Sequence, residues 1–329
     1  MARLKLIRSG VYDKVNQDSK DLLDDYILEL EAQGKSKGTI YQYTADIKGF
    51  LCWVYSNLNN KYILKLRKRD FRKFFLTMMK NGCSAARVNR FQSSIRNILE
   101  YAANEDDDIY DYDVNEAHSL KGLSKSPVRK VVFLEDDKVT FLINELMSEK
   151  DYQLATFVSL AYDSAARRNE LRQVNRTTFE ESNSSNTVRG KRGKKFKLMY
   201  FDRTKECAKK WLDMRDDDCE ALFIDSAGSE VTRANNATLY GFILKLRKIL
   251  KKKYGRDIHL KTHDFRHSAL ENYSNGSHYI LKQLGKDKLP LNILKVIAHH
   301  SSIDTTQSYL EDHDDDILEQ TFGIDLGGE

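Results

Sequence analysis

The chain has 329 residues, of which 40% are hydrophobic and 31% charged, and its formal net charge is +5. This length favours two domains, and the composition is that of a globular protein with a packed core, which excludes a disordered or fibrous chain. The four cysteines form no CxxC pair, which excludes a disulfide-stapled scaffold and indicates reduced thiols. No apolar run has the length of a signal peptide or a membrane span, so we expect a cytoplasmic protein without a membrane partner.

The charge is unevenly distributed along the chain. Residues 189–197 hold six Lys or Arg in nine, and residues 245–256 hold seven in twelve. Residues 105–113 hold six acids in nine. Such segregated clusters predict one positive face, suited to a polyanion, in spite of the modest net charge.

Apolar residues recur at helical spacing in four segments of the first region. One runs from Ser19 to Gly34, the next follows Ser36, the third spans residues 69–80, and the fourth spans residues 88–102. With only two prolines in the whole chain, helices are rarely interrupted. The pattern predicts a compact bundle of four antiparallel helices.

The rest of the chain has a different organisation. After an N-terminal tail over residues 1–17 and the helical domain over residues 18–105, residues 106–132 lack helical periodicity and are predicted to be a linker. Residues 133–329 form a second domain, helical at first. Within it, residues 187–201 carry β-branched and aromatic residues around a basic Gly-containing turn, which predicts a β-hairpin. The fold class is therefore mainly α with a small β-hairpin or sheet.

Four short segments of the second domain carry residues suited to phosphate chemistry. They are residues 164–171 (SAARRNEL), 190–195 (GKRGKK), 263–267 (HDFRH) and 298–309 (AHHSSIDTTQSY). Direct attack on a phosphodiester requires a nucleophile, cations against the non-bridging oxygens, and a proton donor for the leaving 5′ oxygen. A tyrosine hydroxyl, arginine guanidiniums, histidines and a lysine supply these functions.

In order, residue type and spacing, these segments resemble the tyrosine recombinase (phage integrase) family, whose patterns are TGLRxSEL, GKGxK, HxLRH and LGHxxxxTTxxY. The resemblance implies a four-helix core-binding domain followed by an α+β catalytic domain. It also implies site-specific recombination, as in the integration or excision of a phage or mobile element, through a 3′-phosphotyrosyl intermediate. No cofactor and no metal are expected.

Carried over residue by residue, the resemblance assigns a role to nine side chains. The catalytic set is Arg167, Lys191, His263, Arg266, His300 and Tyr309, with Tyr309 as nucleophile. The supporting set is Glu170, His267 and Lys194, with Lys194 as the alternative to Lys191 for the assisting lysine.

Two positions depart from the family pattern. The glycine expected before the first arginine is replaced within Ala165-Ala166, and the Leu-Gly expected before the last histidine is Ala298-His299. Because glycine permits close backbone approach, these changes predict small shifts of Arg167 or His300.

The expected partner is double-stranded DNA, bound by a dimer or tetramer of the chain. Basic residues of the fourth helix and of residues 245–256 are candidate phosphate contacts, although some of them serve only to solubilise their helices. These candidates are Arg87, Arg90, Arg96, Lys245, Arg247, Lys248, Lys251 and Lys252. The acidic segment after Tyr309 contains Ile317, Leu318 and Phe322. We expect these to pack either on a neighbouring protomer or on their own domain.

Three other functions fit parts of the pattern. A DNA-binding regulator on the same scaffold that never cleaves fits the replaced glycines. A relaxing topoisomerase would use related chemistry without preference for a site. A zinc-dependent hydrolase could be built on His259, His263 and His267, although HExxH is absent and no third-ligand Cys or Glu stands nearby.

Overall fold

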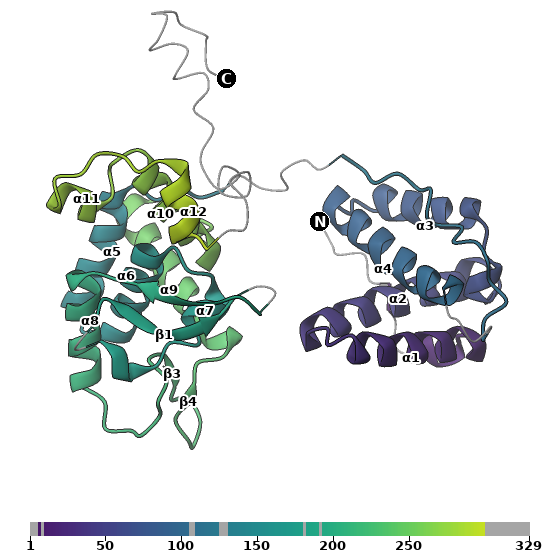
Figure 1. Cartoon of the computed structure of the whole chain (residues 1–329), viewed down its shortest axis with the longest axis horizontal. Helices are drawn as coiled ribbons and strands as arrows, with labels where there is room; N and C mark the ends of the chain where they lie inside the picture. Colours follow the sequence, from purple (N-terminus) through teal and green to yellow (C-terminus); the bar gives the residue numbers. More distant parts are fainter. Residues whose placement is uncertain are drawn as a thin grey trace, which may run out of the picture. The chain divides into compact units, whose positions relative to one another are not determined.

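The computed structural model of the chain describes residues 6–7, 10–104, 109–124, 131–179, 182–190 and 193–299. The chain divides into two compact units, Met1–Arg129 and Lys130–Glu329. The mainly helical architecture with small antiparallel sheets confirms the predicted fold class (Figure 1).

The first unit is a helical bundle in which one helix contacts the other three. Asn16, Ser36 and Ser84 each accept a hydrogen bond from a backbone N–H in the first turn of the helix that follows, which is why three of the helices begin where they do. The last helix packs against each of the others. These helices are α1 (Gln17–Ala32), α2 (Lys37–Asn57), α3 (Lys68–Lys80) and α4 (Ala85–Ala103).

Aromatic rings fill the centre of this bundle. The Phe50 ring of α2 lies 4.8 Å from the Phe74 ring of α3 and 5.7 Å from that of Phe71. Phe74 in turn lies 5.7 Å from Phe91 of α4. Buried rings at these separations add pairwise contacts to the large apolar area that each removes from water, so they join three helices into one core.

Most of the predicted linker packs on the first unit. Within residues 109–124, Tyr112, Ala117 and Leu120 are buried in the core of the bundle. Asn89 of α4 exchanges two hydrogen bonds of 2.8 Å with the backbone of Leu123. Residues 109–124 form no helix, and their buried side chains are not regularly spaced, so the sequence pattern alone did not indicate this packing.

The second unit is built around α6 (Tyr152–Ser164). Every residue from Leu154 to Ser164 is buried, as expected of a helix covered on all sides. It packs against α5 (Asp136–Ser148), α8 (Asp202–Asp213) and α10 (Thr262–Ser274) (Figure 1). The remaining helices described are α7 (Arg168–Leu171), α9 (Asn236–Tyr254), α11 (Tyr279–Gln283) and α12 (Leu291–Ile297).

Two antiparallel hairpins complete this unit. The predicted one pairs β1 (Ser184–Arg189) with β2 (Lys195–Met199), with Val188 opposite Phe196. A second, β3 (Ile224–Asp225) with β4 (Thr232–Arg233), is too short to give an alternating pattern in the sequence. In the described part of the chain no helix has both the length and the apolar character needed to cross a membrane.

Candidate active site

The first predicted arginine lies in the turn between α6 and α7. Its backbone N–H donates to Oε2 of Glu170 at 2.7 Å, and its Nη1 donates to Oε1 at 3.1 Å. The Glu170 side chain is 2% exposed, whereas that of Arg167 is 27% exposed. The carboxylate therefore caps α7 and holds a guanidinium that still reaches solvent.

Arg266 of α10 connects three segments of the second unit. It is fully buried. Its Nη1 donates to the Ala165 carbonyl at 2.6 Å, and its Nη2 donates to the Ala298 carbonyl at 2.6 Å. One guanidinium thus joins the turn that carries Arg167 to the end of α12, from which the chain continues to His300.

The basic hairpin lies against the end of α12. The Phe196 ring of β2 stacks on the His299 ring, with centroids 3.7 Å apart and an angle of 21° between the planes. Lys194 Nζ lies 3.5 Å from the His299 carbonyl oxygen. Gly190 lets the hairpin close, because a Cβ there would stand 2.6 Å from the Phe196 ring.

Positive charge gathers around His299. Its pKa is lowered to about 4, first by burial and then by the positive charges of Lys194, Arg266 and Arg167. Three cations from three segments therefore lie close enough to act on one imidazole. A cluster of this kind is suited to hold an anion such as a phosphodiester.

Two further histidines lie on α10. His263 is exposed one turn before the buried Arg266. Its ring lies 5.2 Å from that of His267, which in turn lies 5.9 Å from the Phe133 ring. Among the residues described, no three His, Cys, Asp or Glu side chains form a group able to hold a metal ion, so His259, His263 and His267 do not form one there.

Two family models match the chain. The phage integrase family matches residues 132–315, more than half of the chain. The chain belongs to the phage integrase family. The N-terminal SAM-like domain of phage integrases matches residues 23–106, which include most of the helical bundle.

Relatives of this phage integrase are similar over most of its length. The SPbeta prophage-derived recombinase-like protein YomM of Bacillus subtilis (strain 168) is 25% identical over 317 residues, covering 92% of this chain and 90% of that protein. Tyrosine recombinase XerA of Pyrococcus horikoshii is 24% identical, covering 88% and 89%.

Solved structures share the fold of the phage integrase. A lambda integrase dimer bound to a COC′ core site matches with a TM-score of 0.65 and 17% identity, over 88% of this chain and 94% of that one. The Tn1549 transposon integrase in complex with circular intermediate DNA matches with a TM-score of 0.63 and 15% identity, over 91% and 98%.

Three predicted catalytic residues lie outside the described part of this integrase. They are Lys191, His300 and Tyr309. The apolar residues Ile317, Leu318 and Phe322 of the tail also lie outside it. The structure does describe the residues next to them, Gly190 and Gly193 on the hairpin and His299 at the end of α12.

The two replaced glycines both fall on left-handed backbone. Ala165 has a φ of 49° and His299 a φ of 54°. Residues with a Cβ adopt this region at a cost in free energy, so the integrase keeps the backbone conformation that favours glycine without having the glycine.

Several candidate phosphate contacts of the first unit have partners inside it. Arg90 pairs with the buried Asp46 through two hydrogen bonds of 2.8 Å. Arg96 donates to the carbonyls of Ala117 and Leu120 and so holds the middle of the predicted linker. Arg87 contacts Cys83 Sγ at 3.5 Å.

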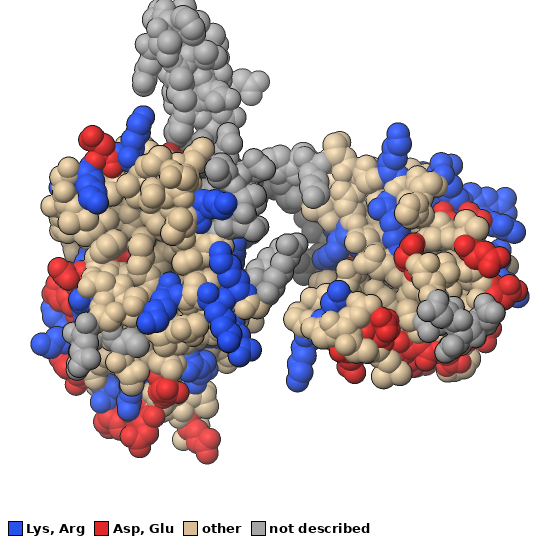
Figure 2. Space-filling model, in the orientation of Figure 1, with Lys and Arg blue, Asp and Glu red and all other residues tan. Residues whose placement is uncertain are grey.

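The candidate contacts on α9 are similarly divided. Lys245 pairs with Asp151 at 2.6 Å, Lys251 with Asp257 at 3.0 Å, and Arg247 donates to the Leu260 carbonyl. Lys248 and Lys252 are exposed. On the face that Figure 2 shows, Lys and Arg side chains form a column along one side of the second unit, on the side where Figure 1 draws α7 and the basic hairpin.

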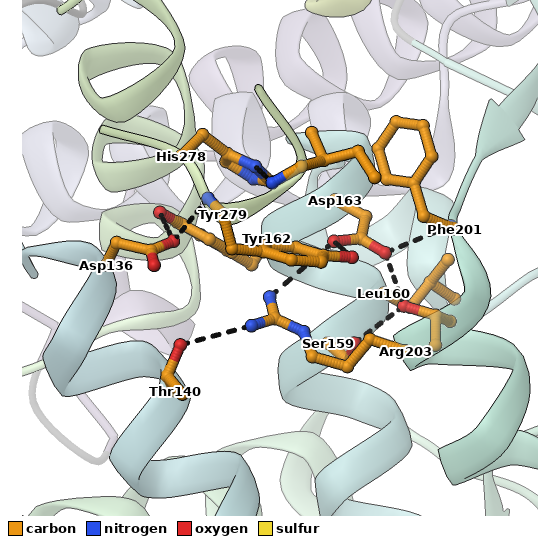
Figure 3. Close-up of polar contacts among 12 residues, drawn as sticks. Asp136, Thr140, Ser159, Leu160, Tyr162, Asp163, Phe201, Arg203, His278 and Tyr279 are labelled. Atoms are coloured by element: carbon orange, nitrogen blue, oxygen red, sulfur yellow. Dashed lines mark hydrogen bonds and ion pairs between the residues drawn. The ribbon is translucent and has the colours of Figure 1, made fainter. Parts of the chain in front are cut away.

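A buried polar network at the end of α6, next to the Arg167 turn, has no local signature in the sequence. Asp163, fully buried in the last turn of α6, accepts hydrogen bonds from Phe201 N at 3.1 Å, Thr204 Oγ1 at 2.6 Å and Tyr279 Oη at 3.0 Å (Figure 3). Burial raises the pKa of Asp163, and Arg203, 3.8 Å away, opposes that shift.

A histidine between two tyrosines extends this network. The His278 ring stacks on Tyr162 at 4.2 Å and on Tyr273 at 3.9 Å, and burial holds its pKa well below the usual range. Tyr273 Oη donates to the Asp163 carbonyl at 2.9 Å. The end of α6 is thus fixed by residues more than a hundred positions later, a pairing with no local sequence signal.

Proposed function

We propose that this chain is a site-specific DNA recombinase that cuts and rejoins DNA through a covalent bond to Tyr309. The observation that carries the proposal is the bridge made by Arg266 between the Ala165 and Ala298 carbonyls. It brings together the turn of Arg167, the helix of His263 and the segment that leads to His300. Family membership supports the same conclusion.

The proposed chemistry is a transesterification at one phosphate. The Tyr309 oxygen attacks phosphorus and loses its proton, while the bond from phosphorus to the 5′ oxygen breaks and that oxygen gains a proton. Arg167 and Arg266 stabilise the charge on the non-bridging oxygens, with His263 and His300 donating to the same phosphate. One phosphoester bond replaces another, so the reverse reaction rejoins the strand without an added source of energy.

The basic hairpin supplies the proton in this scheme. Lys191 is the proposed general acid for the 5′ oxygen, with Lys194 as the alternative. Glu170, which already binds the backbone and guanidinium of Arg167, orients that arginine. His267, whose ring lies beside that of His263, supports the histidine.

Double-stranded DNA is the proposed substrate, and both units are proposed to contact it. The helical domain over residues 18–105 serves as the core-binding domain, and residues 133–329 serve as the catalytic domain. Lys248 and Lys252, exposed on α9, are stronger candidates for phosphate contacts than Arg90 and Arg96, which have intramolecular partners. We propose assembly as a dimer or tetramer on a phage or mobile-element site.

A nicked suicide substrate tests the proposal. The wild-type chain should form a covalent protein–DNA adduct with its site, and Tyr309→Phe should bind the same DNA without forming the adduct. Tyr152→Phe, at the other end of α6 from the Arg167 turn, is the matched control and should react like the wild type. Tight binding with no adduct would instead support the non-cleaving regulator, which the replaced glycines suggested. Relaxation of supercoils without site preference would support the topoisomerase.

A further inference from the structure

We propose that His299 is a positioning residue whose ring holds the basic β1–β2 hairpin in place over the reacting phosphate. This inference rests on the proposed function, because the hairpin carries Lys191 and Lys194. Two contacts with the hairpin converge on His299: the stack of its ring on Phe196 at 3.7 Å, and the approach of Lys194 Nζ to its carbonyl oxygen at 3.5 Å.

The backbone conformation at His299 is a second observation that supports this role. Its φ of 54° lies where a glycine is favoured, and the family pattern has glycine at this position. A glycine would relieve the strain but would have no ring to set against Phe196. The histidine therefore keeps an unfavourable backbone conformation together with a contact that glycine is unable to make.

The partner ring is itself firmly placed. Phe196 pairs with Val188 across the hairpin and lies so close to Gly190 that a Cβ there would overlap it. Gly190 directly precedes Lys191, and its N–H donates to the Lys194 carbonyl at 2.8 Å. By holding Phe196, the His299 ring therefore also holds the base of the hairpin tip, on which the proposed general acid stands.

The positive charges around His299 favour a structural role for its ring over a role in proton transfer. The groups that face His299 are Lys194 of the hairpin, Arg266 of α10 and Arg167 of the α6–α7 turn, and with burial they lower its pKa to about 4. The imidazole is neutral near pH 7, so it stacks without adding a fourth cation. It acts through the lysine and is not itself the proton donor.

The expected effect is a slower proton transfer to the leaving oxygen with no loss of DNA binding. A misplacement of about 1 Å in a catalytic group can cost a factor of about 100 in rate, and loss of a general acid costs about 100-fold or more. We therefore expect His299→Gly to slow single-turnover cleavage by about 10- to 100-fold. The variant should still fold, because its backbone is relieved.

A substrate with sulfur in place of the bridging 5′ oxygen separates this role from general damage. A thiolate leaves without being protonated because thiols are far more acidic than alcohols. His299→Gly should be slow on the oxygen substrate and close to wild type on the sulfur substrate, and Lys191→Ala or Lys194→Ala should show the same selective rescue for whichever lysine is the acid. Lys150→Gly, at an exposed residue with a φ of 58° between α5 and α6, controls for left-handed glycine substitution and should match the wild type on both substrates.

A second variant tests the contact from the hairpin side. Phe196→Leu keeps an apolar side chain but loses the flat ring, and should reproduce the selective loss. Because both substitutions remove the same contact, the rate of the double variant should fall by less than the product of the two single effects. Equal slowing on oxygen and sulfur substrates, independent effects of the two changes, or an unchanged rate in His299→Gly would each overturn the role of His299. A wild-type chain that forms no adduct would contradict the proposed function itself, and the role of His299 with it.

Discussion

The turn after α6 and the turn after α12 share a backbone conformation but place different side chains on it. Ala165 and His299 both have left-handed φ values. Arg266 donates to the carbonyl of Ala165 in the first turn and to the carbonyl that precedes His299 in the second. The Ala165 methyl group is buried in the core, whereas the His299 ring reaches outward to the hairpin.

The two turns also differ in what supports them. The turn after α6 rests on the Asp163 network, which joins α6 to α8 and α11 (Figure 3). The end of α12 gains support from its stack on Phe196, a contact made by one side chain with a strand. The same left-handed backbone is therefore fixed by the core in the turn after α6 and by a contact with the basic hairpin in the turn after α12.

Removing Arg266 should affect both turns at once and is expected to have the largest effect. Arg266→Ala leaves two buried carbonyls without these donors, and we expect a loss of about 3–5 kcal/mol in the free energy of unfolding. Cleavage of the suicide substrate should fall by about 1000-fold, since a phosphate contact is lost as well. Calorimetry and adduct formation measure the two effects.

Arg256→Ala, at an exposed position after α9, is the control for stability. An Arg266→Ala chain that unfolds at the wild-type temperature would show that the bridge does not hold the turns together. Arg266→Lys keeps the charge but has no planar fork to span both carbonyls, so it should fall between the wild type and Arg266→Ala.

Removing Asp163 should damage only the first of the two turns. Asp163→Ala deletes the acceptor for Phe201 N, Thr204 and Tyr279 and leaves Arg203 without its buried counter-charge. We expect a loss of about 3 kcal/mol, because one partner of a buried charged group is removed. Chemical denaturation measures it, with the exposed Asp213→Ala of α8 as control. Equal stability of the two variants would mean that the network does not support α6.

Acid should weaken the second turn through His299. Because its pKa in the folded chain is about 4, below the usual value of 6.5, the unfolded chain binds a proton that the folded chain does not between these values. Its contribution to stability is therefore complete above pH 6.5 and is lost as the pH falls towards 4.

The unfolding temperatures of the wild type and His299→Gly, measured across this pH range, give the contribution as a difference. As the pH falls, the unfolding temperature of the wild type should decrease more than that of His299→Gly. His278, whose pKa is also lowered, is present in both chains and cancels. A difference that stays constant with pH would contradict the buried, neutral state of His299.

Local patterns predicted much of this fold. Helical spacing and the capping residue Ser36 act within a few positions, so the four helices of the first unit could be located from the sequence. The β1–β2 hairpin was predicted for the same reason, although β1 already begins at Ser184. Arg167 and Arg266 could be singled out because their motifs are short and ordered.

Long-range pairings could not be predicted in this way. The acceptors of Arg266 lie 101 and 32 positions away, and that choice follows from packing. Arg90 was a candidate DNA contact because its positive charge was visible, but its partner Asp46, 44 positions earlier, was not. At His299 the sequence indicated only that the glycine of the family pattern is replaced. The contact of its ring was not visible, because the stacking partner Phe196 lies on another element.

The smallest expected effect compares two left-handed residues that differ in burial. Lys150 is exposed, so Lys150→Gly relieves backbone strain of about 1–2 kcal/mol and gives back about 0.4–1 kcal/mol through the more flexible unfolded chain. Ala165→Gly has the same two terms but also removes a buried methyl group, worth about 0.8 kcal/mol. Lys150→Gly should therefore stabilise the chain by a few tenths to about 1 kcal/mol, and Ala165→Gly should leave stability nearly unchanged. Urea denaturation of both variants measures the gap, and a larger gain for Ala165→Gly would show that the turn after α6 is more strained than that at Lys150, in spite of the network behind it.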